Sequence, residues 1–392
     1  MFRKLPIILI VMIAAIVLLN PYLSMEIKQN IYAVSLTVKS LILLILPFVI
    51  FALLFNTIVG MARGATAVIA FILIMVCCSN FVSTFLSHYV GAWIYDFNLS
   101  LIMPKDSTGL TPAWSFQFPR LIANDKAMLL GIVLGLILGR FKNDLARKIS
   151  KKLEWLIAKT LQSFVILITL FVAGFIVKMQ FDGTVQVIIK DYTMIFLVVM
   201  IAQFSYIFFM YAVLSYFKPR EFFNSIKNML PAAVAGFSTM SSASVMPLTI
   251  VGAEMNAKNK TLARSVIPAT VNIHLVGDCI AIPIFAYAVM KSFGIAEPAL
   301  MTYLVFVFYF VLAKFSVAAI PGGGIVVMLP ILESCLGFNG EMLSLITALY
   351  ILFDPVITSA NVLGNGMFAK MIDKLTAISF SKKMNVLSVN SV

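Results

Sequence analysis

Charged residues, cysteine and histidine are all scarce in this chain. Only 11% of its 392 residues are charged, 2 are histidine and 4 are cysteine. The cysteines lack the spacing of a metal site or of an extracellular disulfide framework, so we expect them to act as small apolar residues. We expect no cofactor. A soluble domain with 61% hydrophobic residues and so few charges would aggregate, which excludes that class of protein.

Long apolar runs are what the sequence does contain. A helix that crosses a membrane needs roughly 20 apolar residues. The early runs are continuous, whereas those after residue 220 are interrupted by proline, glycine or polar residues. The runs are Leu5–Leu23, Ala33–Val59, Thr66–Ile94, Met128–Leu138, Leu153–Met179, Tyr192–Phe217, Pro231–Val251, Leu262–Met290, Leu304–Leu332 and Met342–Leu375. The sequence therefore predicts an all-α polytopic membrane protein. The opening run lacks a convincing cleavage site, so we interpret it as the first transmembrane helix rather than a signal peptide.

Basic residues give an expected orientation. The segment Arg140–Lys159 holds seven Lys or Arg against two acidic residues, which places it in the cytoplasm by the positive-inside rule. Counting spans from it puts both termini in the cytoplasm and Asp96–Asn124 outside. The net charge of +13 is thus explained by topology, and it indicates no nucleic-acid partner. We expect a multi-pass protein of the inner (plasma) membrane, in contact with lipid.

Two segments predict re-entrant helical hairpins. Lys218–Arg264 carries cytoplasmic-type charge at both ends around a serine-rich centre, and each arm is too short to span a membrane alone. Ala318–Pro330 contains Pro321 followed by three glycines, which cannot continue a regular helix and which let backbone groups approach a ligand. We expect this second hairpin to enter from the outside. Two opposed hairpins, each followed by an interrupted helix, would form an inverted repeat with its site at the membrane midplane.

A polar stripe is expected on the last helix. Asp354, Thr358, Asn361 and Asn365 recur at i, i+4, i+7 and i+11, which places them on one helix face. Pro355 predicts a helix break beside the carboxylate. An intramembrane carboxylate is costly and usually faces a bundle interior or a watered cavity, so we interpret the stripe as a solute or ion site. The alternative is a structural polar patch that joins helices.

The interrupted helix Leu262–Met290 contributes a second group of polar residues. His274 and Asp278 are four residues apart and could pair on an intact helix. A carboxylate favours the charged imidazole whereas burial opposes it, and the sequence leaves that balance open.

Four motifs together resemble one family. They are FSTMSSASVMPLT (Phe237–Thr249), NIHLVGD (Asn272–Asp278), IPGGG (Ile320–Gly324) and DPVITSANVLGN (Asp354–Asn365). They are similar to motifs of the dicarboxylate/amino acid:cation symporters, which include glutamate and neutral amino acid transporters. The resemblance implies a secondary transporter, not an enzyme, that forms a homotrimer and works by an elevator mechanism. It also implies eight transmembrane helices plus two hairpins, with 1–220 as six N-terminal helices (scaffold, trimerisation and part of the transport domain) and 221–392 as the transport core.

The resemblance also assigns substrate residues. Asp354 matches the acid that holds the substrate amino group, and Asn361 matches the asparagine that binds its α-carboxylate. Ile357 stands where carriers of acidic amino acids have an arginine, so a neutral amino acid is favoured, with an acidic amino acid or dicarboxylate as the alternative. The expected substrate site comprises Ser241, Ser242, Pro321, Gly322, Gly324, Asp354, Ile357, Thr358 and Asn361.

The coupling ion is expected to be H⁺, Na⁺ or both. The resemblance implies ion or proton coupling at Ser79, Asn272, His274, Asp278 and Asn365, with Asn272 and Asn361 as possible sodium ligands. Asn365 and His274 replace acidic residues of the family, so we expect at most one weak sodium site, built largely from main-chain carbonyls. We also hypothesise that a proton on His274, shared with Asp278, takes over part of the coupling. A structural bridge between the two is the alternative.

Three other functions compete with transport. An aspartyl intramembrane protease using Asp354 and Asp278 would leave the hairpins without a role. A channel would need a polar lining through both halves, and the first six spans are nearly free of polar residues. An inactive or structural membrane homologue stays open, because several expected ion ligands are altered.

Overall fold

The structure is a computed structural model that describes residues 15–16, 18–62, 67–96, 109–119, 121–122, 124–141, 143–182, 184–315, 317 and 322–389. The part of the chain that the structure describes is 84% helical and contains no strand. After a single 3-10 turn, η2 (Asn20–Tyr22), the helices are α2 (Met25–Ala62), α3 (Ala67–Asp96), α4 (Asn124–Phe141), α5 (Asn143–Phe181), α6 (Thr184–Leu214), α7 (Pro219–Thr239), α8 (Met246–Asn256), α9 (Lys260–Thr270), α10 (Val276–Ser292), α11 (Leu300–Lys314), α12 (Gly323–Leu336) and α13 (Gly340–Val389).

Most described residues of the apolar runs from Ala33 onward lie on helices, as predicted. By length and apolar composition, Ala70–Asp96, Tyr192–Leu214 and Gly340–Ala377 qualify as membrane-crossing helices. Most of the expected first span lies outside the described residues, and so do the basic residues Arg3, Lys4 and Arg63.

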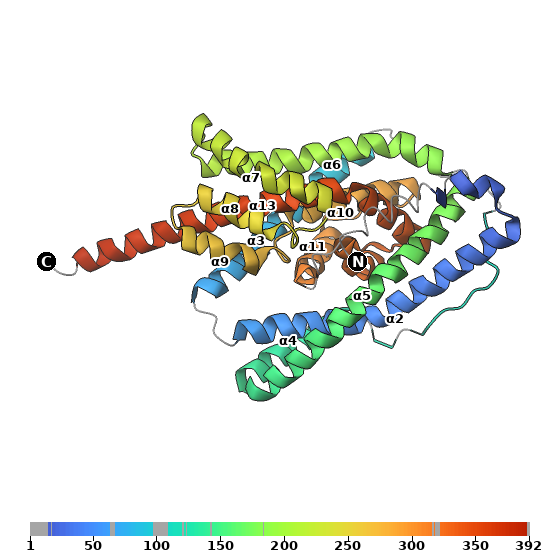
Figure 1. Cartoon of the computed structure of the whole chain (residues 1–392), viewed down its shortest axis with the longest axis horizontal. Helices are drawn as coiled ribbons and strands as arrows, with labels where there is room; N and C mark the ends of the chain where they lie inside the picture. Colours follow the sequence, from blue (N-terminus) through green and yellow to red (C-terminus); the bar gives the residue numbers. More distant parts are fainter. Residues whose placement is uncertain are drawn as a thin grey trace.

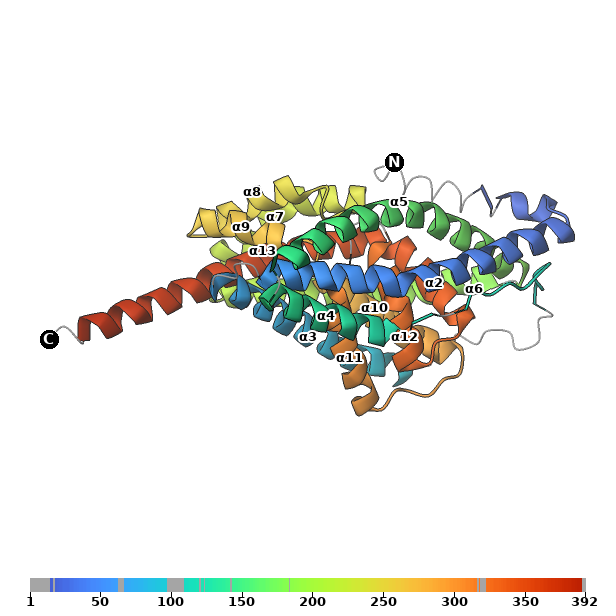
Figure 2. The same ribbon diagram turned by 90° about the horizontal axis from the view of Figure 1, so that it is seen from below.

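The helices form two groups. Helices α2, α4 and α5 pack mainly against one another and lie along one side of the molecule (Figures 1 and 2). The remaining helices gather around α10 and α13, and every residue of α10 but Lys291 is buried. Helices α3 and α6 come from the N-terminal half of the sequence, yet α3 packs on α10 and α11, and α6 packs on α10 and α13. The core that surrounds the polar stripe is therefore assembled from both halves of the chain.

At each of the two segments predicted to form a re-entrant hairpin, two consecutive helices pack against each other. Helix α7 ends at Thr239, and Met240 caps it in the left-handed conformation with φ 50° before α8 begins at Met246. Helices α11 and α12 likewise pack side by side. The tip residues 318–321, including Pro321, lie outside the described residues. The sides of the membrane from which the hairpins enter stay a prediction.

One of the two expected helix interruptions is observed. The segment Val271–Leu275 separates α9 from α10, as predicted. The break expected at Pro355 is wrong, because α13 runs through it as one helix of 50 residues. A proline in a membrane helix is tolerated where neighbouring helices hold the freed backbone in place. Here α10 and α7 pack against α13 and supply that support.

Polar contacts tie the ends of the first hairpin to the rest of the core. The Asp373 carboxylate of α13 accepts backbone hydrogen bonds from Lys258 at 2.8 Å and Asn259 at 2.9 Å. On the exposed side, a hydrogen bond from the Arg264 guanidinium lowers the pKa of the Glu254 carboxyl. These contacts fix α8 and α9 relative to α13 at the end where the sequence predicts the cytoplasm.

Candidate functional site

The polar stripe of α13 is buried along its length. Asp354 and Thr358 are each 4% exposed, Asn361 is 5% exposed and Asn365 is 0% exposed. The Thr358 hydroxyl donates to Asp354 Oδ1 at 3.1 Å, and the Asn365 amide donates to the Asn361 carbonyl at 2.9 Å. The predicted register on one helix face is therefore present.

Asp354 meets neutral donors. Besides Thr358, its carboxylate accepts a hydrogen bond from the backbone N–H of Gly322 at 3.0 Å. Gly322 caps the start of α12 with φ 72°, a left-handed conformation that favours glycine. The tip of the second hairpin thus reaches the stripe through a main-chain group, in the way that its glycine run predicts.

Asp278, in the first turn of α10, is paired with Lys314, the last residue of α11. Lys314 Nζ lies 2.9 Å from Asp278 Oδ2, and the two side chains are 0% and 2% exposed. Asp278 Oδ1 accepts from the Tyr350 hydroxyl at 3.1 Å and from Asn361 Nδ2 at 3.0 Å. We name Asp278, Lys314, Tyr350 and Asn361 the ion-pair cluster.

The two asparagines of the stripe tie α13 to the interrupted helix. Asn361 Oδ1 accepts the backbone N–H of Gly277 at 2.8 Å and so caps the start of α10. Asn365 Nδ2 donates to the carbonyls of His274, at 3.3 Å, and Asn361, at 2.9 Å. At Asn365 an amide N–H therefore satisfies carbonyl oxygens of the kind that a sodium ion prefers.

The hypothesised His274–Asp278 pair is wrong. The two residues do not share a helix, because α9 ends at Thr270 and α10 begins at Val276. His274 instead makes a 2.9 Å hydrogen bond through Nε2 with the Ser79 hydroxyl of α3, and its Nδ1 has no partner among the described residues. Next to it, Asn80 donates to the Ile273 carbonyl at 2.7 Å. Ser79 and His274 are thus brought together, but they lie on the α3 side of the break.

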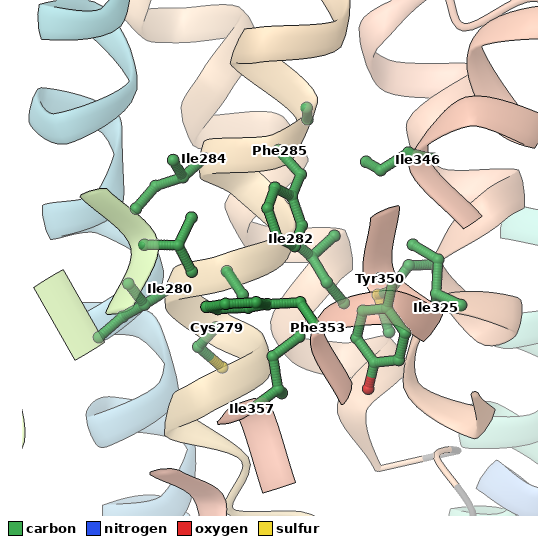
Figure 3. Packing of buried hydrophobic residues seen from close by; sticks show 14 of the residues in the cluster. Cys279, Ile280, Ile282, Ile284, Phe285, Ile325, Ile346, Tyr350, Phe353 and Ile357 are labelled. Carbon is green, nitrogen blue, oxygen red and sulfur yellow. The ribbon is translucent and has the colours of Figure 1, made fainter. Parts of the chain in front are cut away.

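Three other expected site residues lie at the helix break, in the apolar core and in the tip of the first hairpin. Asn272 is exposed at the break and is not part of the buried cluster. Ile357 is fully buried in the apolar packing between α13 and α10, with Phe353 and Cys279 close by (Figure 3). Ser241 accepts a hydrogen bond from the Ser244 hydroxyl at 3.0 Å within the tip of the first hairpin.

That first hairpin reaches α13 through α7. Gly236 of α7 faces Thr358 and Val362 of α13, and the serine-rich tip begins four residues later. Within the tip, Ser242 is buried. Contact of Ser241 and Ser242 with a substrate stays a prediction.

Sequence reasoning missed Lys314, Tyr350 and Gln203. Lys314 had a clear signal, because it is a charged residue inside the apolar run Leu304–Leu332. Tyr350 had a weaker one, since it lies four residues before Asp354 and extends the stripe by one turn. Gln203 of α6 donates to the Gly277 carbonyl at 2.9 Å, a long-range contact that its own sequence neighbourhood does not predict.

Comparisons with known proteins identify the family of the chain. The family model of the sodium:dicarboxylate symporter family matches residues 125–375. An excitatory amino acid transporter from Onchocerca volvulus is 28% identical over 154 residues, which are 38% of this chain and 30% of that protein's length. The family consists of transporters rather than enzymes, which confirms the expectation on that point. Because the family model covers α4 to α12 and the stripe-bearing part of α13, the chain belongs to the sodium:dicarboxylate symporter family.

Proposed function

We propose that this protein is a secondary active transporter that carries an amino acid, with a neutral one favoured, across the inner membrane by cation-coupled symport. Membership of a symporter family supports the reaction type. The similarity to an excitatory amino acid transporter supports an amino acid as substrate class. The structural observation that carries the proposal is the setting of Asp354.

Asp354 suits the amino group of a substrate. Its carboxylate is 4% exposed, and its described hydrogen-bond donors, Gly322 N–H and Thr358 O–H, are uncharged. A buried carboxylate is stabilised when a cation reaches it, and the ammonium group of an amino acid is such a cation. A dicarboxylate without an amino group would bring only negative charge to this place.

The balance of charge favours a neutral side chain on the substrate. Lys314 is the basic member of the ion-pair cluster, and Asp278 already pairs with it. At Ile357 the chain has a buried apolar side chain where the resembled acidic carriers have arginine. A second substrate carboxylate would therefore lack a cation to pair with.

The remaining features of the proposal follow the family resemblance. Sodium is the coupling ion that the family description supports. A proton shared between His274 and Asp278 has lost its geometric basis, so we do not include it. We propose a homotrimer with an elevator mechanism, in which residues 1–220 provide the scaffold and trimer contacts plus part of the transport domain, and residues 221–392 provide the transport core.

A thermal-shift screen of the purified full chain tests the substrate. Neutral amino acids should raise the melting temperature Tm, because a ligand that binds the native state at 100 times its Kd stabilises it by about 2.7 kcal/mol. Succinate and aspartate should raise Tm little, and hydroxy acids that lack the amino group should not raise it.

Two variants serve as controls for that screen. Asp354→Asn should abolish the response to amino acids, whereas Ser334→Ala, a change at an exposed residue of α12, should keep it. Stabilisation of the wild type by succinate and not by alanine, serine or leucine would overturn the proposal. Uptake into liposomes under a sodium gradient, compared with an imposed pH gradient, then identifies the coupling ion, and native mass spectrometry should show a trimer.

A further inference from the structure

The proposed function gives Lys314 no contact with the substrate. Its side chain is 0% exposed, and its ammonium lies 2.9 Å from Asp278 and 4.6 Å from the centre of the Phe310 ring. A lysine in the middle of an apolar helical hairpin is costly and is usually kept for a functional reason. The question is what this cation does beside Asp278.

The donors around Asp278 leave little room for another cation. An ionised carboxylate has about four acceptor sites on its two oxygens. Asp278 uses one for Lys314 at 2.9 Å, one for Tyr350 at 3.1 Å and one for Asn361 at 3.0 Å. All three donors are buried, so they cannot turn outward to water without a rearrangement of the core.

The backbone of α12 closes the cluster on another side. A Cβ atom added at Gly324 would overlap Asp278 Oδ2 and the Tyr350 hydroxyl. The ion-pair cluster therefore fills the space that a side chain at Gly324 would need. A sodium ion prefers several oxygen ligands at once. While Lys314 is present, the close packing leaves no further free oxygen atoms beside Asp278 to bind one.

We propose that the ammonium of Lys314 is a tethered cation that takes the place of a diffusible sodium ion at Asp278. Both cations carry one positive charge and both stabilise a buried carboxylate, but the lysine cannot leave. The inference rests on the proposed symport, because a lysine that replaces one sodium ion lowers the number of sodium ions transported in each cycle. Asn365 offers a parallel. Its amide donates to the carbonyl oxygens of His274 and Asn361, which are oxygens of the kind that bind a cation.

Replacement of the lysine should create a sodium site. In the Lys314→Met variant, the purified full chain should melt at a higher temperature in NaCl than in choline chloride of equal concentration, by several degrees. The reference is the Lys314→Met/Asp278→Asn double variant, in which both charges are absent. The wild type should show no larger sodium-dependent rise in melting temperature than the double variant. In the wild type Lys314 already pairs with Asp278, and in the double variant the carboxylate is absent.

Two results would overturn the proposal. One is a folded Lys314→Met variant whose response to sodium equals that of the double variant. The other is a wild type that responds to sodium more strongly than the double variant, since Asp278 would then bind sodium despite Lys314. If the Lys314→Met variant cannot be purified in either salt, the test is the sodium-dependent change in melting temperature of the wild type compared with that of the double variant. A larger change in the wild type overturns the proposal, and equal changes support it. The readout needs no substrate, so a failure of the proposed substrate leaves this test intact.

Discussion

At the scale of single residues, the buried ionisable groups differ in how they are neutralised. Asp278 and Lys314 pair directly at 2.9 Å, whereas Asp354 is met by the neutral donors Gly322 and Thr358. An ion pair that is removed as a unit leaves no charge behind, but removal of one partner leaves the other buried and unpaired. Substitutions at these positions should therefore have very different effects.

A double-mutant cycle on the ion pair should be strongly non-additive. Lys314→Met and Asp278→Asn should each destabilise the protein by about 3–5 kcal/mol in sodium-free buffer, because each strands a buried charge. The double variant should lie much closer to the wild type. The measurement is the melting temperature in detergent, with Ser334→Ala as the neutral reference. Additive losses would show that the two side chains do not stabilise each other.

Ile357 gives a prediction on substrate choice. Ile357→Arg should lower Tm by several degrees, because it buries a charge in the apolar packing beside Phe353 at a cost of several kcal/mol. Added aspartate or glutamate should recover part of that loss, since the substrate carboxylate would pair with the new guanidinium. Ile357→Leu is the matched control, and it should cost less than about 1.5 kcal/mol and respond to no acidic ligand. Recovery in the control as well would contradict the assigned position.

At the scale of elements, α12 is bounded by two glycines in the same backbone conformation. Gly322 starts the helix with φ 72° and Gly337 ends it with φ 69°. A Cβ atom would find nothing within 4 Å at Gly337, and at Gly322 it would only touch Ile351 at 4.0 Å. The two positions therefore share the same backbone strain on substitution. Gly322 is buried and donates a hydrogen bond to Asp354, whereas Gly337 is exposed at the other end of the helix.

This difference separates strain from ligand binding. Gly322→Ala and Gly337→Ala should each lose roughly 1–2 kcal/mol of stability from the left-handed conformation. Only Gly322→Ala should also weaken substrate affinity, because a shift of its N–H moves the donor away from Asp354. Titration calorimetry with the best neutral amino acid from the thermal screen measures the affinity. Equal affinities for the two variants would mean that Gly322 does not position the carboxylate.

At the scale of the whole molecule, the chain joins a layer of α2, α4 and α5 to a core around α10 and α13 (Figure 1). The core recruits α3 and α6 from the N-terminal half, so the division at residue 220 does not separate the two groups of helices in space. The described part of the basic segment Arg140–Lys159 lies at the end of α4 and in the first half of α5, both in the layer. Its charge gives the orientation that we expect for both groups.

Reporter fusions test that orientation. A green fluorescent protein fused after Val392 should fluoresce and an alkaline phosphatase fused there should be inactive, because we expect the C-terminus in the cytoplasm. Alkaline phosphatase inserted between Asp96 and Asn124 should be active. The opposite pattern would invert the topology and would place the base of the first hairpin outside.

The sequence predicts much of this fold because its signals are local. Apolar runs, the serine-rich centre and the glycine run lead to the helices and hairpins, and the period of 3.6 residues gives the stripe of α13. Pro355 does not interrupt α13, because α7 and α10 pack against the helix, and the sequence around the proline does not show that support. The partner of Asp278 was missed because Lys314 is 36 residues away, and no local spacing indicates such a contact. His274 was paired wrongly since the helix break moves it towards α3.

A tethered cation has an electrical consequence. In the proposed elevator cycle, Lys314 travels with the transport core in both directions, so its charge cancels over a complete cycle and is never delivered across the membrane. An amino acid with a neutral side chain carries no net charge either. Each charge moved against a potential of 100 mV corresponds to about 2.3 kcal/mol, and here only diffusible ions can supply it. The current per transported amino acid, recorded on a solid-supported membrane, therefore counts the ions that Lys314 has not replaced.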